Sequence, residues 1–150
     1  LNFESNYDGS GASAQPHIII LGVYGSSNAR KRNVVEKITR RIQRDNLFDV
    51  VVMASLMKKP DFRRIQDELG NMLGLQLHEK TLEGRATRLC EMIKMEENIL
   101  IILDDLWGGI NLGRIGIPFG NDHKGCKILL VAESQEVLSN QMNTQIEISV

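Results

Sequence analysis

The sequence predicts a three-layer α/β/α fold with a mainly parallel sheet of about five strands. Short runs of apolar, β-branched residues alternate along the chain with segments whose apolar residues recur at helical spacing. This alternation is typical of a parallel sheet that is covered by helices. The clearest strand, residues 99–103, consists of apolar residues only, which indicates that both of its faces are buried.

Length and composition indicate one globular domain. The chain has 150 residues, 42% apolar and 25% charged, with a formal net charge of −1. This balance argues against a generally nucleic-acid-binding or membrane-binding surface. Cys90 and Cys126 lie in apolar segments, which favours a reducing compartment over a disulfide framework. No apolar run approaches the ~20 residues that a membrane-spanning helix needs.

The expected elements follow from periodicity and from turn and capping residues. Residues 1–16 are polar and rich in glycine and serine, as in a linker or a frayed terminus. We expect strands over 18–23, 50–54, 99–103 and 128–131, and a strand nearer the sheet edge over 146–150. We expect helices from beside Lys31 to about Asn46, from Asp61 to about Gly74, over 86–93 with an end near Glu97, and briefly through Val137 and Leu138 with Ser134 as a possible cap. Residues 106–126 are predicted to be mostly loop with one short helical turn.

The segment between the first strand and the first helix has the frame of a phosphate-binding loop. A working loop has the pattern GxxxxGK[ST], because backbone N–H groups must close around phosphate and a hydroxyl must bind Mg²⁺. Gly25 and Lys31 fit this pattern, but Arg30 replaces the second glycine and Arg32 replaces the hydroxyl residue. The candidate nucleotide-binding residues are Gly25, Ser26, Ser27, Asn28, Ala29, Arg30, Lys31, Arg32 and Asn33.

Two acids follow the strand at 99–103. Ligands of open parallel sheets bind at the carboxyl ends of the strands, where both this pair and the loop are expected. In a nucleoside triphosphatase, Asp104 would organise Mg²⁺ and Asp105 would lie near the attacking water. The alternative is that the two acids only solvate the end of the strand.

Five blocks of the sequence carry a family resemblance. IIILGVYG, LFDVVVMA, PDFRRIQDELGNMLGL, ILIILDDLW and GCKILLVAES resemble, in order and spacing, the nucleotide-binding domain of plant NBS-LRR (NB-ARC) disease-resistance proteins. Trp107, after the paired aspartates, is similar to the non-TIR, coiled-coil branch. The resemblance implies a P-loop NTPase-like fold. It makes residues 17–150 a nucleotide-binding subdomain that stops before the family's helical and winged-helix subdomains.

The resemblance also implies a function and partners. The family members are cytoplasmic immune receptors that contain a STAND-type ATPase. This ATPase holds ADP at rest, exchanges it for ATP on activation and resets by weak hydrolysis with Mg²⁺. The implied partners are the coiled-coil, helical, winged-helix and leucine-rich-repeat parts of a parent receptor, and other receptor copies. The basic run at residues 30–44 has no accompanying stacking aromatics, so nucleic acid is not expected as a partner.

The departures from the family pattern fall on the chemistry. The family loop reads GMGGVGKTT, so that Arg30 stands at a glycine and Arg32 at the Mg²⁺-ligating threonine. Glu133 stands where the family has an arginine thought to sense phosphate, and Val131 replaces a threonine near it. We therefore expect a preserved fold with an impaired, catalytically inactive nucleotide site. The alternatives are a pseudo-ATPase that serves as a protein-interaction module, and an active weak ATPase with an unusual loop.

Overall fold

The computed structural model describes residues 20–118 and 125–150. Five strands form one sheet in the order β2-β3-β4-β1-β5, and each pairing between them is parallel. The predicted α/β architecture with a parallel sheet of about five strands is therefore confirmed. The predicted linker at 1–16 and the first two residues of the predicted strand at 18–23 lie outside the described residues.

The elements alternate as the periodicity predicts. The strands are β1 (Ile20–Tyr24), β2 (Val50–Ser55), β3 (Ile99–Leu106), β4 (Cys126–Ala132) and β5 (Ile146–Ser149). The helices are α1 (Asn28–Asp45), α2 (Phe62–Met72), α3 (Leu82–Lys94), the short α4 (Leu112–Ile115) and the π-helical η1 (Val137–Gln141). The predicted edge position of the last strand is confirmed, because β5 stands at one end of the order of the described strands, beside β1.

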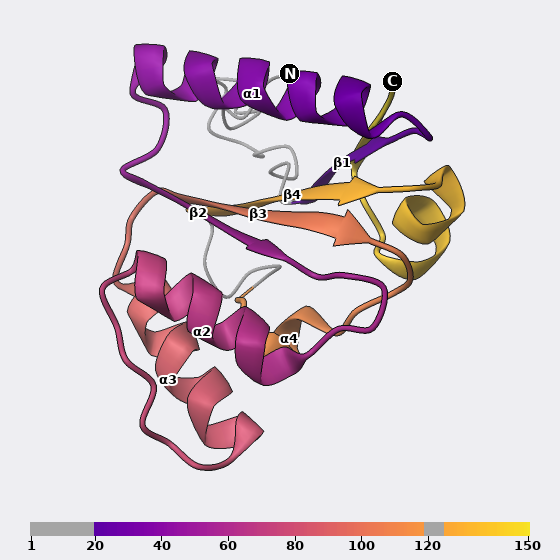
Figure 1. The fold of residues 1–150 in the computed structure, drawn as a ribbon. Helices are drawn as coiled ribbons and strands as arrows, with labels where there is room; N and C mark the ends of the chain where they lie inside the picture. Colours follow the sequence, from indigo (N-terminus) through magenta and orange to yellow (C-terminus); the bar gives the residue numbers. More distant parts are fainter. Residues whose placement is uncertain (1–19, 119–124) are drawn as a thin grey trace, which may run out of the picture.

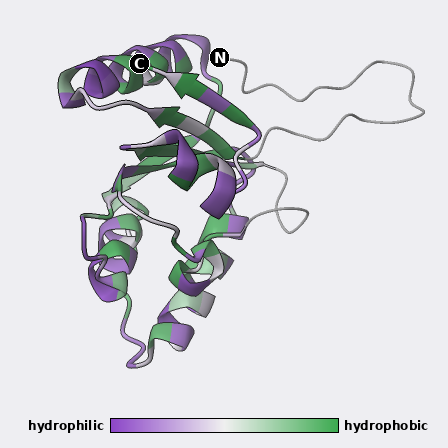
Figure 2. Ribbon diagram, turned by 90° about the vertical axis from the view of Figure 1, so that its right-hand side faces the viewer, coloured by the Kyte–Doolittle hydropathy of each residue, from purple (hydrophilic) through white to green (hydrophobic). Residues whose placement is uncertain are grey.

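Helices cover the two faces of the sheet unequally. In the described part of the chain, α1 covers one face alone, and α2, α3 and α4 lie on the opposite face (Figure 1). Each face of the sheet has its own hydrophobic core. Alternate residues of a strand contribute to one core or the other, because successive side chains of a strand point to opposite faces. The outward side of α1 is hydrophilic, whereas the strands beneath it are largely hydrophobic (Figure 2). The core under α1 consists of Leu21, Val23, Ile38, Ile42, Leu100, Ile102, Leu129 and Val131.

Capping residues fix where the helices begin and end. Asp61 caps α2 as predicted, because its side chain accepts a hydrogen bond from the N–H of Arg64. The predicted stop at Gly74 is also confirmed, since this residue follows α2 with φ of 72°. Asn46 ends α1 in the left-handed conformation, with φ of 51°.

Several predicted boundaries differ from the structure. Strand β3 does not stop at Leu103, because a register shift after this residue lets pairing resume at Leu106. Helix α3 ends at Lys94 rather than near Glu97, because residues 95–98 turn back toward β3. The last predicted helix begins at Gln135, directly after the predicted cap position Ser134, and Glu136 before η1 makes no capping hydrogen bond with its side chain.

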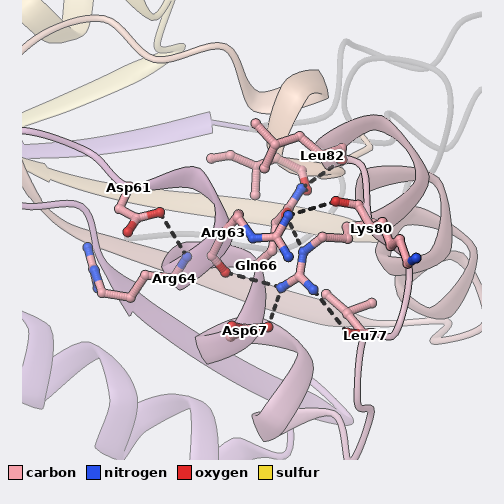
Figure 3. Close-up of polar contacts among 10 residues, drawn as sticks. Asp61, Arg63, Arg64, Gln66, Asp67, Leu77, Lys80 and Leu82 are labelled. Atoms are coloured by element: carbon pink, nitrogen blue, oxygen red, sulfur yellow. Dashed lines mark hydrogen bonds and ion pairs between the residues drawn. The ribbon is translucent and has the colours of Figure 1, made fainter.

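A buried arginine links α2 and α3 on the face of the sheet opposite α1. The guanidinium of Arg85, on α3, donates to the side chain of Gln66 at 3.1 Å and to the carbonyl of Leu77 at 2.9 Å. It also donates to the carbonyl of Arg63 and forms an ion pair with Asp67 (Figure 3). These contacts fix α3 against α2 and the loop between them.

The described residues include no helix that combines the length and the apolar character needed to cross a bilayer.

Candidate functional site

The loop between β1 and α1 is shorter than the phosphate loop that the sequence predicts. Helix α1 begins at Asn28 instead of beside Lys31, so only residues 25–27 remain between the strand and the helix. Ser27 caps the helix: its Oγ accepts from the N–H of Arg30 at 3.2 Å, and its carbonyl accepts from the N–H of Lys31 at 3.1 Å. The N–H of Arg30 is one of the terminal groups that would face phosphate at a helix N-terminus, and the N–H of Lys31 makes the first regular bond of the helix. They are already satisfied within the helix.

Gly25 has a structural reason of its own. A Cβ atom at this position would lie 2.5 Å from the carbonyl oxygen of Val150, which is closer than real Cβ contacts allow. The N–H of Val150 donates in turn to the carbonyl of Tyr24 at 2.9 Å, so the chain after β5 lies directly against the end of β1. The glycine that matches the phosphate-loop pattern is therefore required here for packing.

Lys31 is buried and paired. Its Nζ lies 3.1 Å from Oε2 of Glu133 and 3.5 Å from the carbonyl oxygen of Ala132. The lysine side chain is 8% exposed, whereas that of Glu133 is 42% exposed. The contact arises because β1 and β4 are parallel neighbours, which places the start of α1 beside the end of β4.

The two aspartates lie on a bulge near the carboxyl end of β3. Asp105 has φ of 59°, in the left-handed region, and its N–H donates to Oδ1 of Asp104 at 2.8 Å. The indole Nε1 of Trp107 donates to Oδ1 of Asp105 at 2.6 Å. Both aspartates are exposed. Their position at the carboxyl edge agrees with the sequence-based expectation, whereas the hydrogen bond from Trp107 had no signal in the sequence.

A groove brings the chemical candidates together. It has a volume of about 830 Å³ and lies between α1 and the neighbouring strands β2 and β3. Three of the nine candidate loop residues line it, namely Asn28, Lys31 and Arg32. The other members of the predicted site that line it are Asp104, Asp105 and Glu133.

Sequence reasoning missed the far end of this groove. Thr39, Arg40 and Gln43 of α1 line it opposite Met53 of β2 and Met72 of α2. The only signal for the α1 residues is their helical spacing from Asn28 and Arg32, which places them on one side of the helix. Met53 and Met72 are 47% and 54% exposed. Met53 is exposed because α1 leaves the β2 edge of its face uncovered, and Met72 lies beside it at this edge, where its Sδ accepts a hydrogen bond from the N–H of Met53 at 3.2 Å.

The residues present do not fit a nucleotide phosphate with Mg²⁺. The loop lacks the glycine-lined cradle, and the ammonium group of Lys31 already has an anion. Arg32 is exposed on α1 and offers no oxygen ligand where the metal-binding hydroxyl is expected. In residues 20–118 and 125–150, no group of three or more His, Cys, Asp or Glu side chains is placed to hold a metal ion.

Comparisons with known proteins agree with this architecture. The family model of the NB-ARC domain matches residues 11–150. The chain is 29% identical over 134 residues to the disease resistance protein RPS5 of Arabidopsis thaliana. The aligned segment covers 87% of this chain and 14% of that protein. The chain is 30% identical over 122 residues to the disease resistance protein RFL1 and 27% identical over 121 residues to SUMM2, both from Arabidopsis thaliana. Each of these two alignments covers 79% of this chain and 14% of the relative. With its parallel sheet and a family match over nearly its whole length, the chain belongs to the NB-ARC domain family, the nucleotide-binding module of plant disease-resistance proteins.

Proposed function

We propose that this chain is the nucleotide-binding module of a cytoplasmic plant immune receptor, built as an ADP/ATP switch, in which the phosphate loop no longer supports tight binding or turnover. In this proposal its partners are the coiled-coil, helical, winged-helix and leucine-rich-repeat parts of the parent receptor, and other receptor copies. Asp104 is the inherited Mg²⁺ position and Asp105 the inherited catalytic position.

The cap at Ser27 carries the proposal. A phosphate loop binds by leaving backbone N–H groups free and convergent. In this chain the N–H groups of Arg30 and Lys31 are satisfied by Ser27 before any ligand arrives. Arg32 adds a third departure, because a cation at the hydroxyl position opposes Mg²⁺ instead of binding it.

A second candidate function is a pseudo-ATPase that serves as a protein-interaction module. The exposed methionines at the β2 end of the groove, Met53 and Met72, favour it, because exposed methionines are common on adaptable binding surfaces. Co-purification with coiled-coil or leucine-rich-repeat segments of a receptor would support this second function.

Isothermal titration calorimetry with ADP and with ATP, each with Mg²⁺, tests the proposal. We expect no heat of binding for the unmodified chain at micromolar concentrations. A micromolar or tighter dissociation constant would contradict the proposal and support the active weak ATPase instead.

A repaired loop tests the cause of the weak binding. We expect the double variant Arg30→Gly with Arg32→Thr to restore measurable binding, because it returns the glycine and the metal-binding hydroxyl. The matched control is Arg41→Thr with Arg44→Gly, which removes the same charges from the exposed far end of α1. A gain in the repaired loop alone supports the proposal; equal binding by the two double variants would contradict it.

A further inference from the structure

We propose that Glu133 acts as an internal anion that occupies the phosphate-binding lysine, so that the module carries a self-inhibited phosphate site. The inference rests on the proposed function and adds a second barrier to it, separate from the loop. It concerns the pair formed by Lys31 and Glu133, whose Nζ and Oε2 atoms lie 3.1 Å apart.

The burial of Lys31 makes an anion necessary. Its side chain is 8% exposed, and an ammonium group removed from water is costly unless it is paired and hydrogen-bonded. The carbonyl of Ala132 offers one long contact at 3.5 Å, which satisfies a single donor weakly. Glu133 supplies the charge, and its own exposure of 42% lets water solvate its second oxygen.

The position of Glu133 makes it an effective competitor. The residue directly follows β4, which is fixed between β1 and β3 in the middle of the sheet. Its main chain is held as well, because the N–H of Glu133 donates to the carbonyl of Leu106 at 3.4 Å. A carboxylate that is already placed beside Lys31 does not lose the freedom that a free phosphate loses on binding.

The competition is also electrostatic. A phosphate group that reaches Lys31 must either displace the carboxylate or accept a like charge beside it, and both lower its affinity. An uncharged side chain of the same shape at position 133 would leave the buried ammonium without its anion. The lysine would then be free to bind a phosphate-bearing ligand. Glu133 is therefore a second barrier, beside the loop, to the binding of a di- or triphosphate at this site.

Pyrophosphate binding to the Glu133→Gln variant of the whole 150-residue chain tests this inference. Pyrophosphate is the probe because it carries the phosphates of ADP without the nucleoside. We expect at least about tenfold tighter binding than for the unmodified chain, since a charge-assisted hydrogen bond of this kind contributes at least that much. Circular dichroism and thermal denaturation establish that the variant is folded.

Three comparisons decide the origin of the gain. Glu136→Gln removes the same charge from an exposed residue after the same strand, so its affinity should stay at the value of the unmodified chain. Adding Lys31→Met to Glu133→Gln should abolish the gain, because the lysine is the group set free. Glu133→Asp retains the charge on a side chain that is one methylene shorter, and we expect an intermediate affinity from it.

The failures of the two proposals are distinguishable. Equal affinities of Glu133→Gln and Glu136→Gln, or a gain that persists without Lys31, would overturn the role of Glu133. Tight ADP binding by the unmodified chain would instead overturn the proposed impairment, whatever the ratio between the variants. The repaired loop of Arg30→Gly and Arg32→Thr provides a positive control, because it acts through a different part of the site.

Discussion

Replacement of Arg85 by methionine should remove about a third of a typical domain's stability. Arg85 is 4% exposed and makes three hydrogen bonds to neutral acceptors, namely the side chain of Gln66 and the carbonyls of Leu77 and Arg63. Methionine fills the aliphatic volume but donates nothing. All three acceptors would then lose a buried donor.

The magnitude follows from those three acceptors. At about 1 kcal/mol for each acceptor left unpaired, the expected loss is about 3 kcal/mol. The ion pair with Asp67 adds little, because the Asp67 side chain is 56% exposed and water screens the interaction. Against a usual total of about 5–15 kcal/mol, this loss is large.

Urea unfolding monitored by far-UV circular dichroism measures the effect. With a slope of about 2 kcal/mol per M, the midpoint should fall by about 1.5 M with the slope unchanged. Arg88→Met is the matched control, because Arg88 is exposed on the same helix. Its midpoint should stay within about 0.3 M, the range expected of an exposed substitution. If Arg85→Met and Arg88→Met unfold at the same urea concentration, the arginine network does not stabilise the α2–α3 layer.

Three further predictions follow from local geometry. Gly116→Ala should lower the free energy of unfolding by more than about 3 kcal/mol, because Gly116 has φ of 110° and the new Cβ would lie 2.4 Å from the main chain of α3. Gly108→Ala is the control, because open space surrounds Gly108, and it should be nearly neutral. Thermal denaturation of both variants measures the difference. Burial raises the pKa of the Cys126 thiol from 9.0 to about 12, so the stability that the neutral thiol contributes is complete below pH 9 and is lost as the pH rises toward 12. The difference in unfolding free energy between the unmodified chain and Cys126→Ala should therefore shrink from pH 9 to pH 12. A difference that stays constant over this range would contradict the prediction. Lys31→Met should lower the free energy of unfolding by about 0.5–1 kcal/mol less than Glu133→Gln does. Lys31→Met leaves the exposed carboxylate of Glu133 to water, whereas Glu133→Gln leaves the buried ammonium of Lys31 without an anion. The opposite order of the two variants in urea unfolding would refute the pairing.

Periodicity predicted the order of strands and helices because burial imposes a repeat on the sequence. The apolar runs at 99–103 and 128–131 are strands buried on both faces in the structure, as their lack of alternation predicts. The helix ends at Asp61 and Gly74 are also predictable from the sequence. Asp61 acts on the neighbouring backbone through its side chain, and Gly74 through its lack of one. Local chemistry of this kind depends only on residues within a few positions.

Boundaries that depend on distant partners were not predictable in this way. Strand β3 continues past Leu103 because Leu106 finds a partner in Ala132 of β4. The exposure of Met53 depends on how much of the sheet α1 covers, which no helical pattern states. Ala132 is 26 residues from Leu106, and α1 packs on the sheet through residues outside β2, so neither contact follows from the neighbouring sequence.

The nucleotide site likewise has features that follow from local sequence and features that depend on distant contacts. The break in the loop pattern at Arg30 and Arg32 can be seen in the sequence alone, because a motif consists of residue types at fixed spacing. The contacts that replace the motif depend on the three-dimensional fold. Ser27 caps the helix N-terminus, the carbonyl of Val150 packs against Gly25, and Glu133 reaches Lys31 from the end of another strand. Parallel pairing of β1 with β4 brings residues about a hundred positions apart into contact, and this contact, rather than the loop alone, neutralises the lysine.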